Sequence, residues 1–573
     1  MEINRIPRPE HPFPQFMRDE WMNLNGTWEF EYDYSASGQA RKVFEKAHLQ
    51  DSILVPFCPE SELSGIGNRD FMNSIWYQRY VRIPEEWKGK RMILHFGAVD
   101  FEAVIYINGK EAGNHQGGYV SFSIDITDFL EPGDNRICVC VKDDVRTGRQ
   151  PAGKQSEQYD SYRCLYTRTT GIWQTVWLEA VPENYVEKVR YYPDCENQAV
   201  HLEALVRGSG VLKVSVSYEG DCMGSAVIDM VPGSSRFTIP LRELYLWEPG
   251  HGRLYDVEIS FGEDSVHSYF GMRDVRLDGR KFLINGKSVF QRLVLDQGYY
   301  PDGIYTAPTE EALVQDIDTA LRLGFNGARL HEKVFEPRFL YHCDKKGYLV
   351  WGEHANWGLD ITYSWSVYPF LQEWLEIVDR DFNHPSIIGW CPFNETWDIE
   401  GRKQYDEVLR LVYRTTKALD TTRPCIDTSG NYHVETDIFD VHDYEQDPEI
   451  FRKNYDRLMT EGVLVDRFDD RQTYRGEPCF MSEFGGIRSS FEEGMNWGYG
   501  EAPKNKEEFM ERYRGLVTAI LDNDQMFGFC YTQLYDVESE TNGLYSYERQ
   551  PKFDDQELYK INRQKAAIEE ENS

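Results

Sequence analysis

The chain has 573 residues, of which 41% are hydrophobic and 14% aromatic. This length and composition exclude a disordered chain and a single small core, and they fit roughly three or four domains of about 100–200 residues each. The formal net charge of −34 argues against nucleic acid or an anionic membrane as a partner, because both would be repelled.

The N-terminal segment "MEINRIPRPEHPFPQFM" (1–17) contains no apolar core of a secretory signal peptide. The sequence contains no run of about 18 uncharged apolar residues, so we expect no membrane-spanning helix. The 11 cysteines are scattered, and several lie within strand-like segments, as Cys138 and Cys140 do among valines. Buried thiols in a reducing compartment are the simplest interpretation, so we expect a cytoplasmic protein.

Residues 1–182 consist of short segments in which apolar and polar residues alternate, such as "NRICVCVKDD" (135–144). Turn-forming pairs such as Asn108-Gly109 separate these segments, a spacing typical of a β-sandwich. Residues 183–274 continue with strand signals every 8–12 positions and fit an immunoglobulin-like β-sandwich. The first half of the chain is therefore predicted to form two β domains.

From about residue 275 the pattern changes to strands that alternate with helices. An example of the helical pattern is residues 309–324, whose apolar residues recur at helical spacing between an acidic first turn and a terminal glycine. Eight strands, connecting helices and about 300 residues predict a (β/α)₈ barrel over residues 275–573. The segment 443–477 shows no clear core helix. The predicted barrel strands are 288–295, 326–330, 347–352, 386–393, 424–428, 438–442, 478–482 and 526–532.

Two glutamates follow barrel strands. Glu395 lies in "GWCPFNETWD" (389–398) after the fourth strand, and Glu483 follows the seventh. Reacting groups of such barrels come from the C-terminal ends of the strands, and glycoside hydrolysis needs one carboxylic acid and one carboxylate that face each other. We expect the apolar strand before Glu395 to raise the pKa of its carboxyl group and keep it protonated. The alternative is that Glu395 is an ordinary solvated loop residue.

Motifs along nearly the whole chain resemble glycoside hydrolase family 2. They include "WMNLNGTWEF" (21–30), "YFGMRDV" (269–275), "GFNGARLHEKVFEPRFLYHCDKKGYLVWGE" (324–353) and "NGLYSYERQPK" (542–552), in the family's order. The resemblance implies a jelly-roll β-sandwich at 1–182, an immunoglobulin-like β-sandwich at 183–274 and a catalytic (β/α)₈ TIM barrel at 275–573. It implies a retaining exo-β-glycosidase that acts on terminal β-linked sugars without an organic cofactor.

The same resemblance implies roles for individual residues. Glu395 would be the general acid/base and Glu483 the nucleophile, while His442 and Asp443 are expected to be structural. Trp351 and Trp390 are either sugar platforms or core residues. The expected substrate-binding residues are Asn394 at the sugar 2-hydroxyl, His331, Glu353, Tyr444 beside the nucleophile, Arg329, Trp357 and Gln533.

The sugar is less well defined. β-Glucuronidases of the family carry an Asn-x-Lys motif, and the corresponding window 540–545, "ETNGLY", has no lysine. We therefore expect a β-galactoside. A β-hexuronide is the next alternative, because Arg329, Lys333 or Arg488 could bind its carboxylate. Among hexuronides we favour a β-galacturonide over a β-glucuronide, and a β-mannoside is the last alternative.

The segment "GEHANWGLD" (352–360) lacks the Glu-x-His pair of the metal-dependent β-galactosidases. No metal is therefore expected. The expected partner is a carbohydrate substrate, and the resemblance leaves a homo-oligomer open. The competing class of protein is a non-catalytic carbohydrate-binding protein, which would have no need of the two carboxylates.

Overall fold

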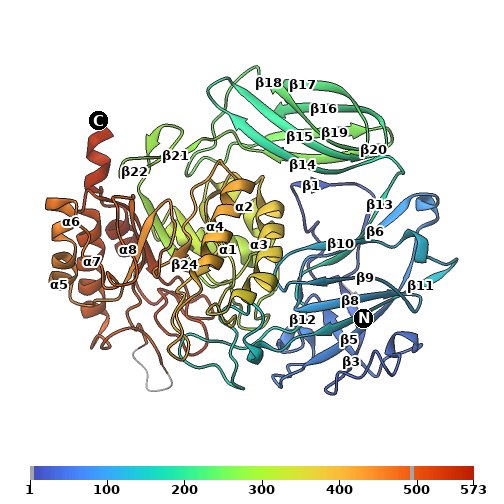
Figure 1. Ribbon diagram of the computed structural model, residues 1–573, viewed down its shortest axis with the longest axis horizontal. Helices are drawn as coiled ribbons and strands as arrows, with labels where there is room; N and C mark the ends of the chain where they lie inside the picture. Colours follow the sequence, from blue (N-terminus) through green and yellow to red (C-terminus); the bar gives the residue numbers. More distant parts are fainter. Residues whose placement is uncertain (1–5, 491–495, 573) are drawn as a thin grey trace.

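Three regions follow one another along the chain (Figure 1). The computed structural model describes residues 6–490 and 496–572, so the outermost residues of the first and third predicted domains, 1–5 and 573, lie outside it. The order of two β-sandwiches and a barrel matches the predicted fold class. The exact boundaries at 182/183 and 274/275 stay predictions. Within the described ranges, no helix combines the length and the apolar character needed to cross a membrane.

The first region is a β-sandwich with the strand orders β10-β6-β13-β2 and β4-β3-β5-β11-β8-β9. Alternation along β11 sends Ile137, Val139 and Val141 into the main core. Cys138 and Cys140 are buried on the opposite face beside Trp76, so they are free, buried thiols as predicted. The strands are β2 (Trp21–Asn23), β3 (Gly26–Tyr32), β4 (Asp51–Val55), β5 (Ser74–Arg82), β6 (Arg91–Phe96), β7 (Val99–Asp100), β8 (Glu102–Ile107), β9 (Lys110–Gln116), β10 (Phe122–Asp125), β11 (Asp134–Lys142), β12 (Gly171–Ile172) and β13 (Val176–Val181).

The second region is an antiparallel sandwich of the sheets β14-β15-β18 and β1-β20-β19-β16-β17. Its inner faces bury alternate residues such as Leu202, Val214 and Val257. The short N-terminal strand β1 (Phe16–Met17) completes one edge by pairing with β20. The strands of this region are β14 (Tyr185–Asp194), β15 (Ala199–Arg207), β16 (Gly210–Tyr218), β17 (Asp221–Met230), β18 (Gly233–Pro240), β19 (Tyr255–Phe261) and β20 (Asp264–Phe270).

A small sheet of β21 (Val275–Asp278), β22 (Lys281–Ile284) and β23 (Lys287–Ser288) leads into the barrel. Seven barrel strands form the sheet β27-β26-β25-β24-β32-β31-β30. The predicted fifth strand, 424–428, is reduced to β29 (Thr428–Ser429), which pairs in parallel with β28 (Phe393–Asn394). The other barrel strands are β24 (Gln291–Asp296), β25 (Gly327–Leu330), β26 (Leu349–Glu353), β27 (Ile387–Cys391), β30 (Phe439–Asp443), β31 (Cys479–Gly485) and β32 (Met526–Thr532).

The barrel helices follow local signals in the sequence. The predicted helix 309–324 is α1 (Glu310–Arg322), capped by the Thr309 side chain, which accepts the Ala312 N–H. Within 443–477, where no clear core helix was predicted, two short helices occur, and each is too short to display a full apolar stripe. The remaining helices are α2 (Pro337–Lys346), α3 (Val367–Asp381), α4 (Asp406–Leu419), α5 (Pro448–Asn454), α6 (Asp456–Glu461), α7 (Lys506–Leu521) and α8 (Asp555–Asn562).

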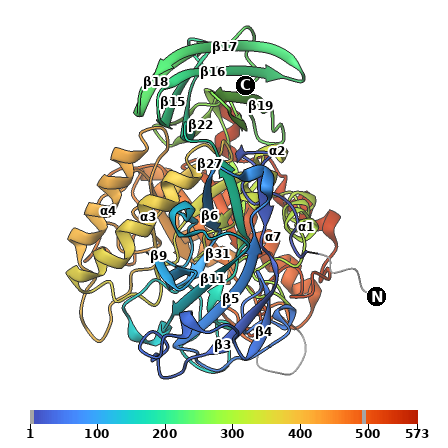
Figure 2. The same ribbon diagram turned by 90° about the vertical axis from the view of Figure 1, so that its right-hand side faces the viewer.

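The first sandwich packs against the barrel, as both views show (Figures 1 and 2). The long loop between β11 and β12 makes the contact. Ala152 N–H donates to Trp357 O at 2.7 Å, and Asp360 N–H donates to Gly148 O at 2.8 Å. Because Trp357 and Asp360 follow β26, the loop lies at the C-terminal rim of the barrel strands.

Candidate active site

The two predicted catalytic carboxylates lie side by side at this rim. Glu483 belongs to β31, and Glu395 follows β28 directly. An oxygen of Glu395 and an oxygen of Glu483 lie within 4.8 Å of each other. The side chains are 13% and 5% exposed, so the pair is accessible to a ligand but mostly shielded from water. The distance is below the ~6.5–9.5 Å that an intervening water requires in inverting glycosidases.

The backbone turns sharply at Glu395. Its φ is 45°, in the left-handed region, which costs a non-glycine residue about 1–2 kcal/mol. The Glu395 N–H donates to Ser429 O at 2.9 Å, which continues the β28–β29 pairing and holds the turn. The strand end thereby directs the Glu395 carboxyl group toward β30 and β31.

Both oxygens of Glu483 accept hydrogen bonds. Arg329 donates from Nη1 to Oε1 at 3.1 Å, and the Tyr444 hydroxyl donates to Oε2. Arg329 also donates from Nε to Glu353 at 2.6 Å, and His331 Nδ1 lies 3.3 Å from the other oxygen of Glu353. These contacts fix the orientation of the Glu483 carboxyl group and place the positive charge of Arg329 beside it.

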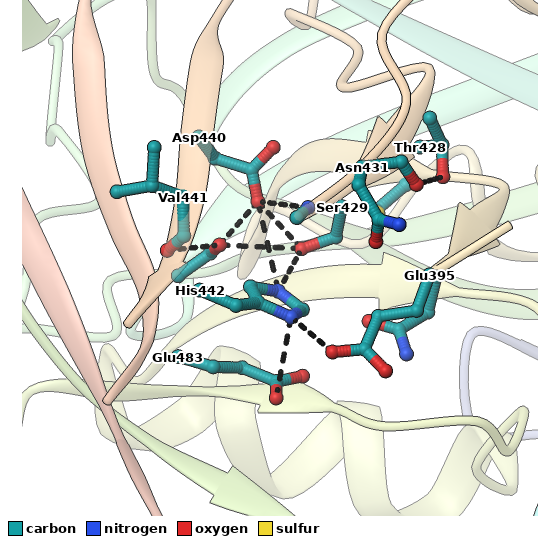
Figure 3. A network of polar contacts seen from close by, with 12 residues as sticks. Glu395, Thr428, Ser429, Asn431, Asp440, Val441, His442 and Glu483 are labelled. Carbon is teal, nitrogen blue, oxygen red and sulfur yellow. Dashed lines mark hydrogen bonds and ion pairs between the residues drawn. The ribbon is translucent and has the colours of Figure 1, made fainter. Parts of the chain in front are cut away.

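His442 lies between the two carboxylates (Figure 3). Its Nδ1 is 2.7 Å from Glu395 Oε1 and 3.5 Å from Glu483 Oε2. On the other side of the ring, Nε2 is 2.9 Å from Ser429 Oγ, which donates its proton to Asp440 at 2.5 Å. Since Ser429 then accepts from Nε2 and a carboxylate accepts from Nδ1, both ring nitrogens act as donors. This arrangement suits the imidazolium form of the ring, in which both nitrogens carry a proton.

The pKa values of this pair agree with the hydrogen bonds. Burial alone would raise the pKa of Glu395, but the hydrogen bond and charge of His442, with the charge of Lys154 and the Trp397 indole, lower it overall. Burial alone would lower the pKa of His442, but the charges of Glu483 and Glu395 raise it. The expectation that burial keeps Glu395 protonated is therefore wrong, because the apolar strand is outweighed by donors from neighbouring elements.

Several predicted substrate-binding residues meet at the pair. Asn394 accepts from Arg329 Nη2 at 3.2 Å with its amide oxygen, so its amide N–H₂ is the end that can donate to a substrate hydroxyl. Trp357 is half-buried, and its Nε1 donates to Asn394 O at 3.1 Å. Arg329 is occupied by Glu353, Glu483 and Asn394, and we therefore do not assign it to a uronate.

Other predicted positions lie farther from the reaction centre. Gln533 is fully buried and donates to Asn542 at 2.8 Å rather than to either carboxylate. Trp351 and Trp390 are core residues, because both are at most 1% exposed and their indole N–H groups donate to Gln291 and Asp420.

Some site residues were missed from the sequence. His442, expected to be structural, precedes Tyr444 by two positions, and the period of a strand places such residues on one face. This spacing is the signal in the sequence that connects His442 with the site. Trp397, 45% exposed, donates to Glu395 Oε2 at 3.1 Å. Tyr499 stacks on Tyr444 with ring centroids 3.4 Å apart. Lys154 comes from the first sandwich, and no sequence signal connects it to the barrel.

Glu395, His442 and Glu483 also have the donor types and mutual spacing of a metal site. In this structure these three side chains are engaged with one another and with Arg329, Tyr444 and Ser429. The expectation that no metal is required stays a prediction.

Comparisons with known families match the first and the third region. The family model described as "Glycosyl hydrolases family 2, sugar binding domain" matches residues 21–182, and that described as "Glycosyl hydrolases family 2, TIM barrel domain" matches residues 275–562.

Individual relatives are similar at low identity. The β-glucuronidase of Canis lupus familiaris is 25% identical over 519 residues, which cover 81% of this chain and 78% of the relative. The β-galactosidase of Thermoanaerobacter pseudethanolicus is 25% identical over 455 residues, which cover 74% of this chain and 56% of the relative. The solved structure of an uncultured Clostridium sp. β-glucuronidase has a TM-score of 0.77 at 21% identity and covers 98% of this chain and 100% of that chain. This last likeness supports the fold alone.

Proposed function

Because the chain belongs to glycosyl hydrolase family 2 and is therefore a hydrolase of O-glycosyl bonds, we propose that it is a retaining exo-β-glycosidase that works by double displacement. The observation that carries this proposal is the spacing of Glu395 and Glu483, whose nearest oxygens lie within 4.8 Å. Retaining glycosidases hold their carboxyl groups ~5–5.5 Å apart, which leaves no room for a water between them.

In the first step, Glu483 attacks the anomeric carbon while the bond to the leaving oxygen breaks. The proton for that oxygen comes from Glu395, which shares one proton with His442 across a 2.7 Å contact. The products of this step are a free alcohol and a glycosyl ester on Glu483. In the second step, Glu395 takes a proton from water, the water oxygen attacks the anomeric carbon, and the ester bond to Glu483 breaks.

The surrounding donors fit these steps. Tyr444 and Arg329 orient the attacking carboxylate of Glu483. The amide N–H₂ of Asn394 is placed to bind the sugar 2-hydroxyl, where hydrogen bonds strengthen in the transition state. We assign His331 and Glu353, which order Arg329 and the nucleophile, to the lining of the same sugar subsite.

The sugar is proposed from the relatives. The sequence motifs favour a β-galactoside, but the β-glucuronidase relative matches a larger share of this chain and of its own length than the β-galactosidase relative does. We therefore propose a β-hexuronide as the substrate class. A β-galactoside is the second candidate, supported by the absence of lysine from residues 540–545 and by the β-galactosidase relative.

The catalytic proposal is tested by labelling and substitution. A 2-fluoro glycosyl fluoride of a turned-over sugar should form a stable ester on Glu483, located by peptide mass spectrometry. Glu483→Ala should lower kcat on aryl β-glycosides by on the order of 10⁴-fold or more, because the nucleophile is removed. Glu507→Ala, which removes an exposed acid from the first turn of α7, is the matched control. A label on another residue, or wild-type turnover in Glu483→Ala, would refute the assignment.

The sugar is tested separately. A panel of aryl β-glucuronide, β-galacturonide, β-galactoside and β-mannoside, with one common aglycone, should give the highest kcat/KM on a uronide. A preference for the galactoside would establish the second candidate while leaving the catalytic proposal intact.

A further inference from the structure

A lysine from the first sandwich reaches the barrel site. Lys154 lies in the loop between β11 and β12, and the residue is 6% exposed. Its Nζ is 4.1 Å from the centroid of the Trp357 ring. The Nε1 of the same indole donates to the carbonyl of Asn394, the residue before Glu395. The ammonium is thus two contacts away from the acid/base residue.

The backbone around Lys154 holds it in this position. Gly153 N–H donates to Trp357 O at 3.0 Å, and Tyr166 N–H donates to Lys154 O at 2.7 Å. Gly153 has a φ of +58°, and a Cβ there would collide with the carbonyl oxygen of Glu332. The close approach of the loop to the barrel, and hence the reach of Lys154, depends on this glycine.

Within residues 6–490 and 496–572, Lys154 makes no direct ion pair. Lys154 interacts with Glu540, Glu483 and Glu395 through charge alone. None of these interactions is a side-chain hydrogen bond. Burial alone would lower the pKa of Lys154, but interactions with Cys164 and with these three carboxylates raise it. Lys154 is therefore protonated at neutral pH, with donors still available.

The surrounding carboxylates have other donors. Glu540 accepts from Tyr166 and from Asn542. Glu395 is bound by His442 and Trp397, and Glu483 is bound as described above. Burial of an ammonium group without a close acceptor is unfavourable, so an arriving acceptor would bind it favourably.

The position of Lys154 relative to the segment after β32 suggests what that acceptor is. Lys154 interacts electrostatically with Glu540, which begins the window 540–545 that contains no lysine. We propose that Lys154 binds the C6 carboxylate of a uronosyl substrate, so that a residue of the first sandwich determines the sugar specificity of the barrel site. This inference rests on the proposed function.

The test compares charged and neutral sugars on the same enzyme. Lys154→Met should lower kcat/KM for aryl β-glucuronide or β-galacturonide by about 10²–10³-fold, the effect expected when a charge-assisted contact to substrate is lost. The kcat/KM for aryl β-galactoside should fall far less, by at most about tenfold, because that sugar offers no carboxylate and is affected only through the loss of the Lys154 charge near Glu395. Lys154→Arg should retain part of the uronide activity, and Lys42→Met, which removes an exposed lysine of the same region, should retain all of it.

A binding measurement makes the test independent of turnover. Calorimetry should detect free glucuronate or galacturonate binding to the wild type and to Lys154→Arg, but not to Lys154→Met. Circular dichroism checks that each variant is folded, and Lys154→Gln replaces Lys154→Met if the latter is not.

Three outcomes would overturn the inference. They are equal losses on charged and neutral sugars, unchanged uronide kinetics in folded Lys154→Met, and a wild type that neither turns over uronides nor binds uronic acids. In each case the 2-fluoro label on Glu483 reports separately whether the catalytic proposal stands. If the wild type hydrolyses no glycoside, the proposed function fails, and uronic acid binding alone decides the role of Lys154.

Discussion

At the scale of single residues, the main feature is the 2.7 Å contact between Glu395 Oε1 and His442 Nδ1, across which the proposed mechanism shares one proton. Two carboxylates within 4.8 Å of each other repel one another when both are ionised, and the imidazolium of His442 between them reduces that repulsion. As Glu483 becomes an ester in the proposed first step, its negative charge disappears. Because that charge raises the pKa of His442, its loss favours transfer of the proton from His442 to Glu395 and from there to the leaving oxygen.

Replacement of His442 should change the pH dependence of catalysis. In the wild type the pair keeps its proton up to the pKa of His442, which is raised above its ordinary value of 6.5. In His442→Asn, Glu395 must hold the proton alone. We therefore expect the basic limb of the kcat/KM profile to move to lower pH by about one unit, with a loss of roughly 10–100-fold at its maximum.

The control is His384→Asn, which breaks a different buried pair, between His384 and Asp344 at 2.6 Å, before β27. This change should lower stability without moving the limb. An unchanged basic limb in His442→Asn would show that His442 holds no catalytic proton.

Sequence patterns led to the residues at strand ends. Glu395, Glu483 and Tyr444 follow or end apolar runs, and the barrel brings such ends together. The charge state of Glu395 could not be predicted in this way, because it depends on His442 and Lys154, which approach from β30 and from the first sandwich. Periodicity describes one element at a time and carries no information about such neighbours.

At the scale of elements, the loop between β11 and β12 is as much a part of the site as the barrel strands. Gly153→Ala should displace this loop, because the new Cβ would meet the Glu332 carbonyl oxygen and because φ is +58°. We expect a loss of thermal stability and a fall in kcat/KM of about tenfold or more, in keeping with a cost of ~2–4 kcal/mol for a steric clash at a strained backbone position.

The matched control is Gly148→Ala in the same loop. Gly148 also has a positive φ, of +69°, but its nearest neighbour beyond the adjacent residues, Asp360 Cβ, is 3.8 Å from the added atom. It should cost only the ~1–2 kcal/mol of a left-handed alanine. If the two variants were indistinguishable, the close approach at Gly153 would have no functional importance.

Elements with complete local signals were predicted well. The helix α1 has a capping threonine, acidic residues in its first turn and a regular apolar stripe. The fifth barrel strand and the helices α5 and α6 were not, because each is too short for its periodicity to be distinguished from that of a loop. The short fifth strand is nevertheless important, since Ser429 within it links Asp440 to His442.

At the scale of the whole molecule, buried acids lie where the first sandwich meets the barrel. Glu373 of α3 is fully buried and accepts the Tyr119 N–H from the first sandwich. Burial raises the pKa of Glu373 to about 8, and burial lowers the pKa of the neighbouring His354 to about 3. Both side chains are thus held predominantly in their neutral forms at pH 7.

Glu373 should make the packing of these regions pH-dependent. An acid whose pKa is raised from 4.5 to about 8 on folding contributes stability that is fully present below pH 4.5 and is lost as the pH rises through 8. We expect the melting temperature of the wild type to fall between pH 5 and 8 relative to Glu373→Gln, whose neutral amide keeps the acceptor for Tyr119. The difference should correspond to a few kcal/mol.

Glu376→Gln provides the comparison on the same helix, because the Glu376 side chain is 36% exposed and pairs with His115. It should leave the wild-type pH dependence of melting in place. Parallel melting curves for Glu373→Gln and wild type would mean that Glu373 is already ionised in the folded state.

The order of the three regions could be predicted from changes in the hydrophobic periodicity along the sequence. The contacts between the regions could not be predicted in this way. Contacts such as Ala152 with Trp357 join residues about two hundred positions apart through backbone groups, which leave no trace in side-chain pattern.

That docking has a consequence for how such proteins diversify. Recombination that exchanges the first sandwich between family members would carry a new loop, with its own charge, onto the rim of an unchanged barrel. Selectivity could then be inherited from a segment that holds none of the reacting groups, and engineers seeking a new sugar preference would graft that loop before altering the strands.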